Sequence, residues 1–476
     1  MTPTTVLKFA LGPLGIGVLG AISLPITSWF FAPEDIGMLA MLQVVIGLGI
    51  MIGSLGLDQA YVREYHLASD KVRLFVMCFF PGLFVVLAFL IGVVFFSPNY
   101  FAQALYSHPS PVLAYLTLAC MILAFVQRYL SIYLRVKEKA LQFSFSQLLP
   151  KFVFLVLVIA LPFYYGLANI YVLMGAQLAG LCSVLIVFFF LVKGGVKFKF
   201  DLAGVRPAFR ALLSFGMPLI LAGVAAWGLR ATDKVMLKNL SGLSELGVYA
   251  VAATISNGAS IVVSVFNTVW APVVYKWEAN GEMASNVELS CRLIQFVVYF
   301  LFVMTGLFSW LFEYILPPKY QQVEYLLAVC LAPPLLYALS EVSSIGINLA
   351  RKTSYSVYAT LVALIISIGC NLWLIPIFGA SGAAISTSLA FYFYLVFRTE
   401  LAVKIWRPVR RRRMYSMTFL VLALSWVGAL WGRELPLRIE VFWLVCAAVG
   451  LFVYWPEIKF SFSALSRRRL RSGREA

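Results

Sequence analysis

The sequence predicts an all-α integral membrane protein with about fourteen transmembrane helices. Of its 476 residues, 62% are hydrophobic and 12% are charged, whereas soluble domains average roughly 45–50% and 25%. The apolar residues form runs of about 20, the length that a bilayer-spanning helix needs. Lipid cannot satisfy backbone polar groups, and the alternating pattern of barrel strands is missing, so these runs are expected to be helices.

The predicted spans follow one another along the whole chain. The first six cover residues 6–31, 37–56, 72–96, 112–134, 143–164 and 170–192. The next six cover residues 209–229, 246–274, 293–316, 325–350, 354–376 and 380–403. The last two cover residues 414–431 and 441–456. Glycine- and proline-rich stretches inside these runs predict bends or breaks in single helices.

Lysine and arginine are distributed unevenly between alternate loops. One side of the predicted topology carries 29 of these residues and the other carries 6. Because positively charged loops stay in the cytoplasm, both termini are predicted to be cytoplasmic. The basic runs 410–413 and 467–471 are interpreted as topology determinants that attract anionic lipid. The net charge of +17 therefore does not indicate nucleic-acid binding, which requires a folded basic domain.

Nothing in the sequence predicts an enzyme, a metal site or a cofactor. The seven cysteines are scattered without CxxC spacing, and His66 and His108 are the only histidines, so a zinc site or disulfide framework is not expected. The predicted loops are short and contain no extramembrane domain. A membrane glycosyltransferase or polysaccharide polymerase is expected to need such a domain for its acid, base or metal ligands.

Weak self-similarity predicts two homologous six-helix halves. Residues 132–137 resemble 347–352, and the Leu161-Pro162 helix end resembles Ile375-Pro376 about 214 positions later. Two further matches, which occur in the same order, are 12–14 with 216–219 and 34–37 with 245–248. The alternative is chance recurrence of Gly-Pro and Leu-Pro. The predicted domains are 1–200 and 201–408 as six-helix bundles, and 409–476 as two extra helices with a basic tail. Because six is even, the symmetry axis is expected along the membrane normal.

Three stretches resemble a known family. Residues 371–384 are similar to the N-x-x-L-I-P-x-x-G-x-x-G-A-A pattern of polysaccharide-export flippases. Residues 56–65 are similar to the stretch after the second helix of those proteins, and a third similarity covers 233–237 with 245–249. Together they resemble Wzx-type O-antigen and oligosaccharide flippases of the multidrug/oligosaccharidyl-lipid/polysaccharide (MOP) exporter superfamily. Teichoic-acid exporters and other polysaccharide flippases share these motifs.

This resemblance implies a fold and a cargo. The implied fold is two six-helix bundles in a V that opens alternately to the two sides of the bacterial inner membrane. The implied cargo is an undecaprenyl-diphosphate-linked oligosaccharide, as used in lipopolysaccharide synthesis, with polymerase and chain-length proteins as partners. An H⁺ or Na⁺ gradient would drive its transport from the inner to the outer leaflet. Physically, a wet cationic cavity open to the bilayer would let the headgroup cross while the lipid tail stays in lipid.

Ionisable residues inside predicted spans are the first candidates for the site, because they are costly in a membrane. Glu341 lies in the tenth span, with Tyr337, Ser344 and Asn348 spaced to share one helical face. One interpretation is a cavity-lining stripe in which Glu341 binds H⁺ or Na⁺. The other is a structural hydrogen bond between helices.

The remaining candidates are charged residues near span ends. Arg128 and Lys151 either face the cavity and attract the diphosphate or snorkel to the interface. Asp58 and Arg63 form either a gate or a surface pair.

A second charged group is predicted at the far-side end of the seventh span. Arg230, Asp233 and Lys234 either pair with one another or line the periplasmic exit. In the first span only Lys8 is charged. Lipid II flippases of this superfamily carry a cation deep in that helix, so a peptidoglycan precursor is disfavoured as the cargo.

Two other functions remain open. A multidrug or cation antiporter of the same superfamily usually has twelve helices, so the extra pair at 414–456 disfavours it. An integral-membrane polymerase or transferase would need a large periplasmic loop, which the sequence lacks.

Overall fold

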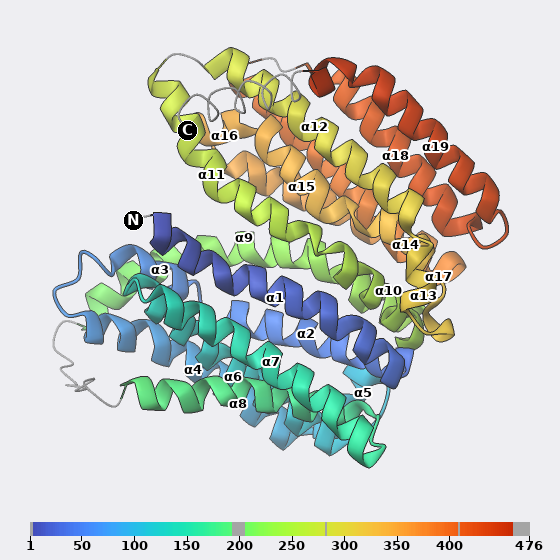
Figure 1. Ribbon diagram of the computed structural model, residues 1–476. Coiled ribbons are helices and arrows are strands. Elements are labelled where there is room, and N and C mark those ends of the chain that lie inside the picture. Colours follow the sequence, from blue (N-terminus) through green and yellow to red (C-terminus); the bar gives the residue numbers. More distant parts are fainter. Residues whose placement is uncertain (1–2, 193–204, 281–282, 408–409, 460–476) are drawn as a thin grey trace, which may run out of the picture. The chain divides into compact units, whose positions relative to one another are not determined.

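The computed structural model describes residues 3–192, 205–280, 283–407 and 410–459. Regular structure within these residues is helical throughout, with no strand (Figure 1). The prediction of an all-α chain is confirmed. The helices form two compact units, Met1–Thr254 and Ile255–Ala476. The domain boundaries predicted from the repeat stay a prediction.

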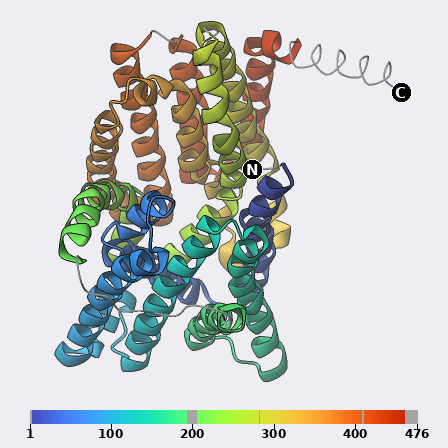
Figure 2. The same ribbon diagram turned by 90° about the vertical axis from the view of Figure 1, so that its left-hand side faces the viewer.

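The first unit is built from ten helices in chain order. They are α1 (Pro3–Phe30), α2 (Pro33–Gly53), α3 (Leu57–Glu64), α4 (Lys71–Phe96), α5 (Pro98–Tyr106), α6 (Pro111–Val136), α7 (Ala140–Tyr165), α8 (Ile170–Val192), α9 (Val205–Leu240) and α10 (Leu243–Ser256). Helix α7 packs between α1 and α8, and α2 packs against α6 and α9. Figures 1 and 2 show these long helices lying side by side.

The second unit contains the remaining helices. They are α11 (Ala259–Ala279), α12 (Met283–Phe308), α13 (Leu311–Ile315), α14 (Val323–Cys330), α15 (Ala332–Ser343), α16 (Ile345–Leu349), α17 (Ser354–Ile405), α18 (Arg412–Trp431) and α19 (Pro436–Val453). A 3₁₀ turn, η1, covers Pro318–Tyr320. Helix α15 packs against α11, α12 and α17, and the last two helices, α18 and α19, both contact α12.

Every predicted span falls on helix. Among the described residues, nine helical segments are long and apolar enough to cross a membrane, and shorter apolar helices accompany them. The expected single helix at 246–274 is wrong, since the chain breaks between α10 and α11 at Asn257–Gly258. The run at 325–350 is also divided, at Leu331 beside two prolines and again at Ser344. The mean hydropathy over a span hardly changes at such breaks, because the few polar residues there are flanked by long apolar runs.

Local sequence explains where several helices begin. The Asp70 carboxylate accepts hydrogen bonds from the amides of Val72 and Arg73, both at 3.0 Å, and so caps α4. Ser97 and Ser110 cap α5 and α6 in the same way, and each is followed by proline at the first helical position. The boundary at residues 96–98 therefore separates the membrane-length α4 from the short α5, which was not predicted.

The family-like motif at 371–384 is a bend between two spans. The chain turns at Gly379, whose φ of 53° and ψ of −126° interrupt helix α17. A side chain at Gly382 would collide with the carbonyl of Leu374 across the bend. Ser381 donates to the carbonyl of Ala429 on α18 at 2.8 Å. The glycines of this motif therefore allow two predicted spans to pack closely at their joint.

A reciprocal contact joins the starts of α2 and α10. A Cβ on Gly37 would collide with the carbonyl oxygen of Leu243, and a Cβ on Gly247 would collide with that of Pro33. Pro33 and Leu243 each open their helix, four residues before its glycine. Gly37 and Gly247 lie in the matched segments 34–37 and 245–248, one position out of register. A larger residue at either glycine would push the starts of α2 and α10 apart.

Candidate functional site

An ion pair joins α3 and α6 in the first unit. Arg128 Nη2 lies 3.0 Å from Asp58 Oδ2, and the amide of Gln59 donates to the same oxygen at 3.2 Å. The Asp58 side chain is 10% exposed and that of Arg128 is 43% exposed. Of the two alternatives for Asp58 and Arg63, the surface pair is therefore wrong, and the gate stays a prediction. Asp58 instead neutralises Arg128, a cation predicted to attract the substrate.

Arg63 lies on the same short helix but belongs to a different environment. Its Nε is 3.4 Å from Glu64, and its guanidinium carbon lies 4.4 Å from the centre of the Phe215 ring. These residues line a cavity of 490 Å³ between α3, the start of α4 and α9. Arg73 and Asp70 also line it. The sequence motif at 56–65 thus positions one charged residue inside the bundle and another at a cavity.

Lys151 lies almost at the midpoint of α7. It is the twelfth of 26 residues, which places it about 16 Å from the helix start. The two alternatives for its side chain, facing the cavity or snorkelling to the interface, stay predictions. Its side chain is half-buried, with the ammonium 5.8 Å from the ring of Phe154. None of the ion pairs between described residues includes Lys151.

The charged group near the end of α9 is organised by helix and neighbour contacts. Asp233 is buried and accepts a hydrogen bond from the hydroxyl of Tyr249 on α10. The ammonium of Lys234 donates to the carbonyl of Arg230 at 3.1 Å, and the Arg230 side chain is exposed. The predicted span ended at residue 229, whereas α9 continues to Leu240. These residues therefore lie on a helix and not in a loop.

The second unit contains a buried ion pair between α15 and α17. Arg398 Nη1 lies 2.6 Å from Glu341 Oε1, and it also donates to the hydroxyl of Ser340 at 3.1 Å. The exposed fractions of the two charged side chains are 6% for Arg398 and 17% for Glu341. The rings of Tyr337 and Tyr394 stack beside the pair, with centroids 6.3 Å apart. Arg398 also lies over the Tyr394 ring at 5.6 Å.

The expected polar stripe around Glu341 is only partly formed. Tyr337 and Glu341 share α15, but that helix ends at Ser343. Ser344 is buried and donates to the carbonyl of Ser340 at 2.6 Å. Asn348 lies beyond the break on α16 and is half-buried. The continuous helical face predicted for all four residues is therefore wrong.

Sequence reasoning missed Arg398 as a site residue, although it lies within the predicted span 380–403. The residue lies well inside α17, whose last residue is Ile405. Helix α15 ends two residues after Glu341, and a carboxylate in the last turn is unfavourable for the helix dipole. Arg398 compensates this charge. A signal was present, because Tyr394 and Arg398 have i,i+4 spacing within the apolar run at 380–403.

The basic run 410–413 makes specific contacts. Arg410 lies 3.2 Å from Glu288 on α12, and Arg411 lies 2.5 Å from Glu400 on α17. Arg413 lies 2.5 Å from the buried Glu457. The interpretation of this run as a lipid-attracting topology signal is therefore incomplete, since three arginines hold helix ends of the second unit together. The second basic run, 467–471, lies outside the described residues.

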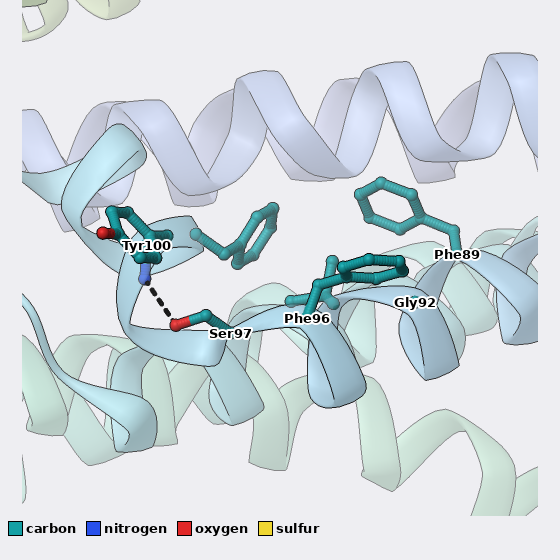
Figure 3. A pocket seen from close by; sticks show the side chains of 7 residues that line it. Phe89, Gly92, Phe96, Ser97 and Tyr100 are labelled. Atoms are coloured by element: carbon teal, nitrogen blue, oxygen red, sulfur yellow. Dashed lines mark hydrogen bonds between the residues drawn. The ribbon is translucent and has the colours of Figure 1, made fainter.

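An apolar cavity lies at the other end of α4. It has a volume of 420 Å³ and is lined by Phe89, Gly92, Val93, Phe96, Ser97, Tyr100 and Phe101. Figure 3 shows the aromatic side chains around it and the Ser97 hydroxyl that caps α5. The polar Arg63 cavity and this apolar one are thus separated by the length of α4. Among the described residues, no group of His, Cys, Asp or Glu side chains has the arrangement of a metal site.

These features define a multi-pass α-helical membrane protein with the fold of MOP superfamily transporters. The sequence match then gives the family. The chain belongs to the polysaccharide biosynthesis protein family, which matches residues 7–277. No curated protein matches the sequence.

Two solved structures illustrate the likeness of the fold. The structure "Lipid II flippase MurJ, inward closed conformation" aligns with a TM-score of 0.66 and 15% identity, over 95% of this chain and all of that one. An inward-facing multidrug resistance MATE family transporter of the MOP superfamily aligns with a TM-score of 0.55 and 14% identity, over 85% of this chain and 96% of that one. At these identities the alignments establish the fold alone.

Proposed function

We propose that the protein flips undecaprenyl-diphosphate-linked oligosaccharide repeat units across the bacterial inner membrane. Its family and the flippase fold support this proposal. The cytoplasmic placement of both termini, proposed from the charge asymmetry, makes the inner leaflet the loading side. Polymerase and chain-length proteins of the same pathway would receive the product in the outer leaflet.

Lys151 is the observation that carries the proposal. Two other charged pairs inside the helical units, Asp58–Arg128 and Glu341–Arg398, are neutral as pairs. Lys151 lies near the middle of a membrane-length helix without a carboxylate in ion-pair distance among the described residues. A charge there costs about 2.5–3.5 kcal/mol, so such a cation needs a functional partner. A diphosphate headgroup supplies the missing negative charge.

Lys151 would therefore act as a transient counter-ion. Its ammonium offers three hydrogen-bond donors on a flexible stem, which suits a headgroup that must bind and leave. The oligosaccharide is neutral or polar and needs water around it, whereas the polyprenyl tail remains in lipid. No covalent bond is made or broken in this step. Arg230 and Lys234, on the far part of α9, are proposed to meet the headgroup at its exit.

We further propose that an H⁺ or Na⁺ gradient drives the cycle through Glu341. In the described conformation Arg398 supplies the positive charge that a coupling cation would supply. The cation would therefore reach Glu341 only in a conformation that separates the pair. Ion binding and rearrangement of α15 against α17 would then be one event.

The test is complementation of a strain that lacks the protein. That strain should accumulate lipid-linked repeat units on the cytoplasmic leaflet. Lys151→Gln should reduce export by about 10- to 100-fold, since a charge-assisted hydrogen bond is worth about 1.5–3 kcal/mol, and Lys151→Arg should retain more export. Lys139→Gln is the matched control, because Lys139 is exposed at the start of the same helix.

Two outcomes would reject the proposal. Wild-type export by Lys151→Gln at normal expression would remove the role of the lysine. Unchanged surface glycan in the deletion strain, together with lost efflux of cationic dyes, would favour a multidrug antiporter instead.

A further inference from the structure

The Arg63 cavity is lined by basic, acidic and apolar side chains. Arg63 and Arg73 line it together with Glu64 and Asp70, so the two signs are balanced. Leu74, Met77, Leu212 and Phe215 are among the apolar lining residues. The volume of 490 Å³ falls within the roughly 300–1,000 Å³ of small-molecule sites. The chemistry of this cavity is thus amphipathic and dipolar.

Arg63 is held ready for a phosphate. Phe215 supports the face of its guanidinium, and Glu64 lies near Nε. The two terminal nitrogens of Arg63 make no hydrogen bond with the described part of the chain, and the side chain is 58% exposed. A stacked guanidinium with a free edge offers two parallel N–H donors to a phosphate.

The acidic wall argues against a simple anion. A phosphate or diphosphate bound at Arg63 would share the cavity with the carboxylates of Glu64 and Asp70. A ligand that carries an ammonium beside its phosphate can pair with both the basic and the acidic side chains of the cavity. The ammonium has three N–H donors, so it binds carboxylates better than a quaternary amine, which has none.

The position of the cavity fits a lipid headgroup. It lies at the first turns of α4, a helix of 26 residues and therefore about 39 Å long. That length exceeds the roughly 30 Å hydrocarbon core, so the start of α4 reaches headgroup level. The exposed Leu67, in the loop beside the cavity, adds apolar surface for the start of an acyl chain.

We propose that this cavity binds the headgroup of an aminophospholipid, with its phosphate on Arg63 and its ammonium between Glu64 and Asp70. This site is independent of the proposed flippase function. Its occupant is a resident membrane lipid that braces α3 against α4 and α9, and it is not the transported substrate.

The experiment measures thermal unfolding of the delipidated full-length protein in detergent micelles. Phosphatidylethanolamine, phosphatidylcholine and phosphatidylglycerol with identical acyl chains are titrated, and tryptophan fluorescence reports unfolding. A ligand that binds the folded state raises its stability with concentration. Phosphatidylethanolamine should act at about tenfold lower concentration than the other two lipids, which corresponds to one charge-assisted hydrogen bond.

Variants then locate the binding site. Arg63→Gln and Glu64→Gln remove opposite charges, and each should abolish this preference. If one of them fails to fold, the other still decides the question. Arg433→Gln serves as the control, because Arg433 is exposed in the turn between α18 and α19 of the other unit; it should behave like the wild type.

Several results would overturn the proposal. Equal or stronger stabilisation by phosphatidylglycerol would identify a plain anion site. Equal stabilisation by soluble phosphoethanolamine would identify a site for a free solute and not for a lipid. A preference that survives both Arg63→Gln and Glu64→Gln would place the lipid elsewhere.

Discussion

Removing the carboxylate of Glu341 should destabilise the second unit strongly. Glu341→Gln leaves Arg398, whose side chain is 6% exposed, as an uncompensated buried charge. Breaking a buried pair in this way costs about 3–5 kcal/mol. For a unit of this size, 1 kcal/mol lowers the midpoint by roughly 2–4 °C, so the expected loss is roughly 6–20 °C.

The double variant separates structural from functional roles. Glu341→Gln combined with Arg398→Gln leaves no buried charge, so it should recover most of the stability lost by the single variant. Arg292→Gln, which removes a half-exposed i,i+4 pair with Glu288, should cost at most about 1 kcal/mol. All variants are compared by thermal unfolding in detergent and by export at several pH values and Na⁺ concentrations.

The two readouts give distinct refutations. If Glu341→Gln lowers the thermal unfolding midpoint no more than Arg292→Gln does, the buried-pair argument is refuted. Recovery of stability together with wild-type, ion-dependent export in the double variant would refute ion coupling through Glu341. Recovered stability with export that no longer responds to the ion gradient is the expected result.

Glycine substitutions test one close contact and one bend, with Gly92→Ala as the control. Gly247→Ala should lower the free energy of unfolding by about 1–3 kcal/mol, because the new methyl group meets a backbone carbonyl. Gly92→Ala, with open space around it, should be neutral or stabilising by up to about 1 kcal/mol. Equal unfolding midpoints for the two variants would contradict the contact at Gly247. Gly379→Ala should cost about 1–3 kcal/mol through backbone strain at its positive φ, and an unchanged midpoint with normal membrane expression would show that the bend does not need glycine there.

Much of the fold was predictable because membrane insertion depends on local composition. Each span needs only enough consecutive apolar residues, and caps such as Asp70 and Ser110 mark helix starts in the sequence. The breaks after Ser256 and at Ser344 were not predictable from hydropathy, since the few polar residues at them do not interrupt the longer apolar runs. The short helices α3 and α5 were missed because they are much shorter than the apolar runs from which spans are predicted.

The sequence by itself determined the class of protein and the order of its apolar helical segments. It also placed several charged residues, such as Glu341, within these segments. It could not determine how those charges pair. Arg398 and Glu341 are 57 residues apart, and Asp58 meets Arg128 across a separation of 70. Such pairs depend on which helices become neighbours and which faces they present. Both are properties of the packing between segments. The free energy of transferring a segment from water into the membrane, in contrast, depends on the composition of that segment alone. For that reason only the tertiary structure distinguished Lys151, which has no ion-pair partner among the described residues, from cations that already have their counter-ions.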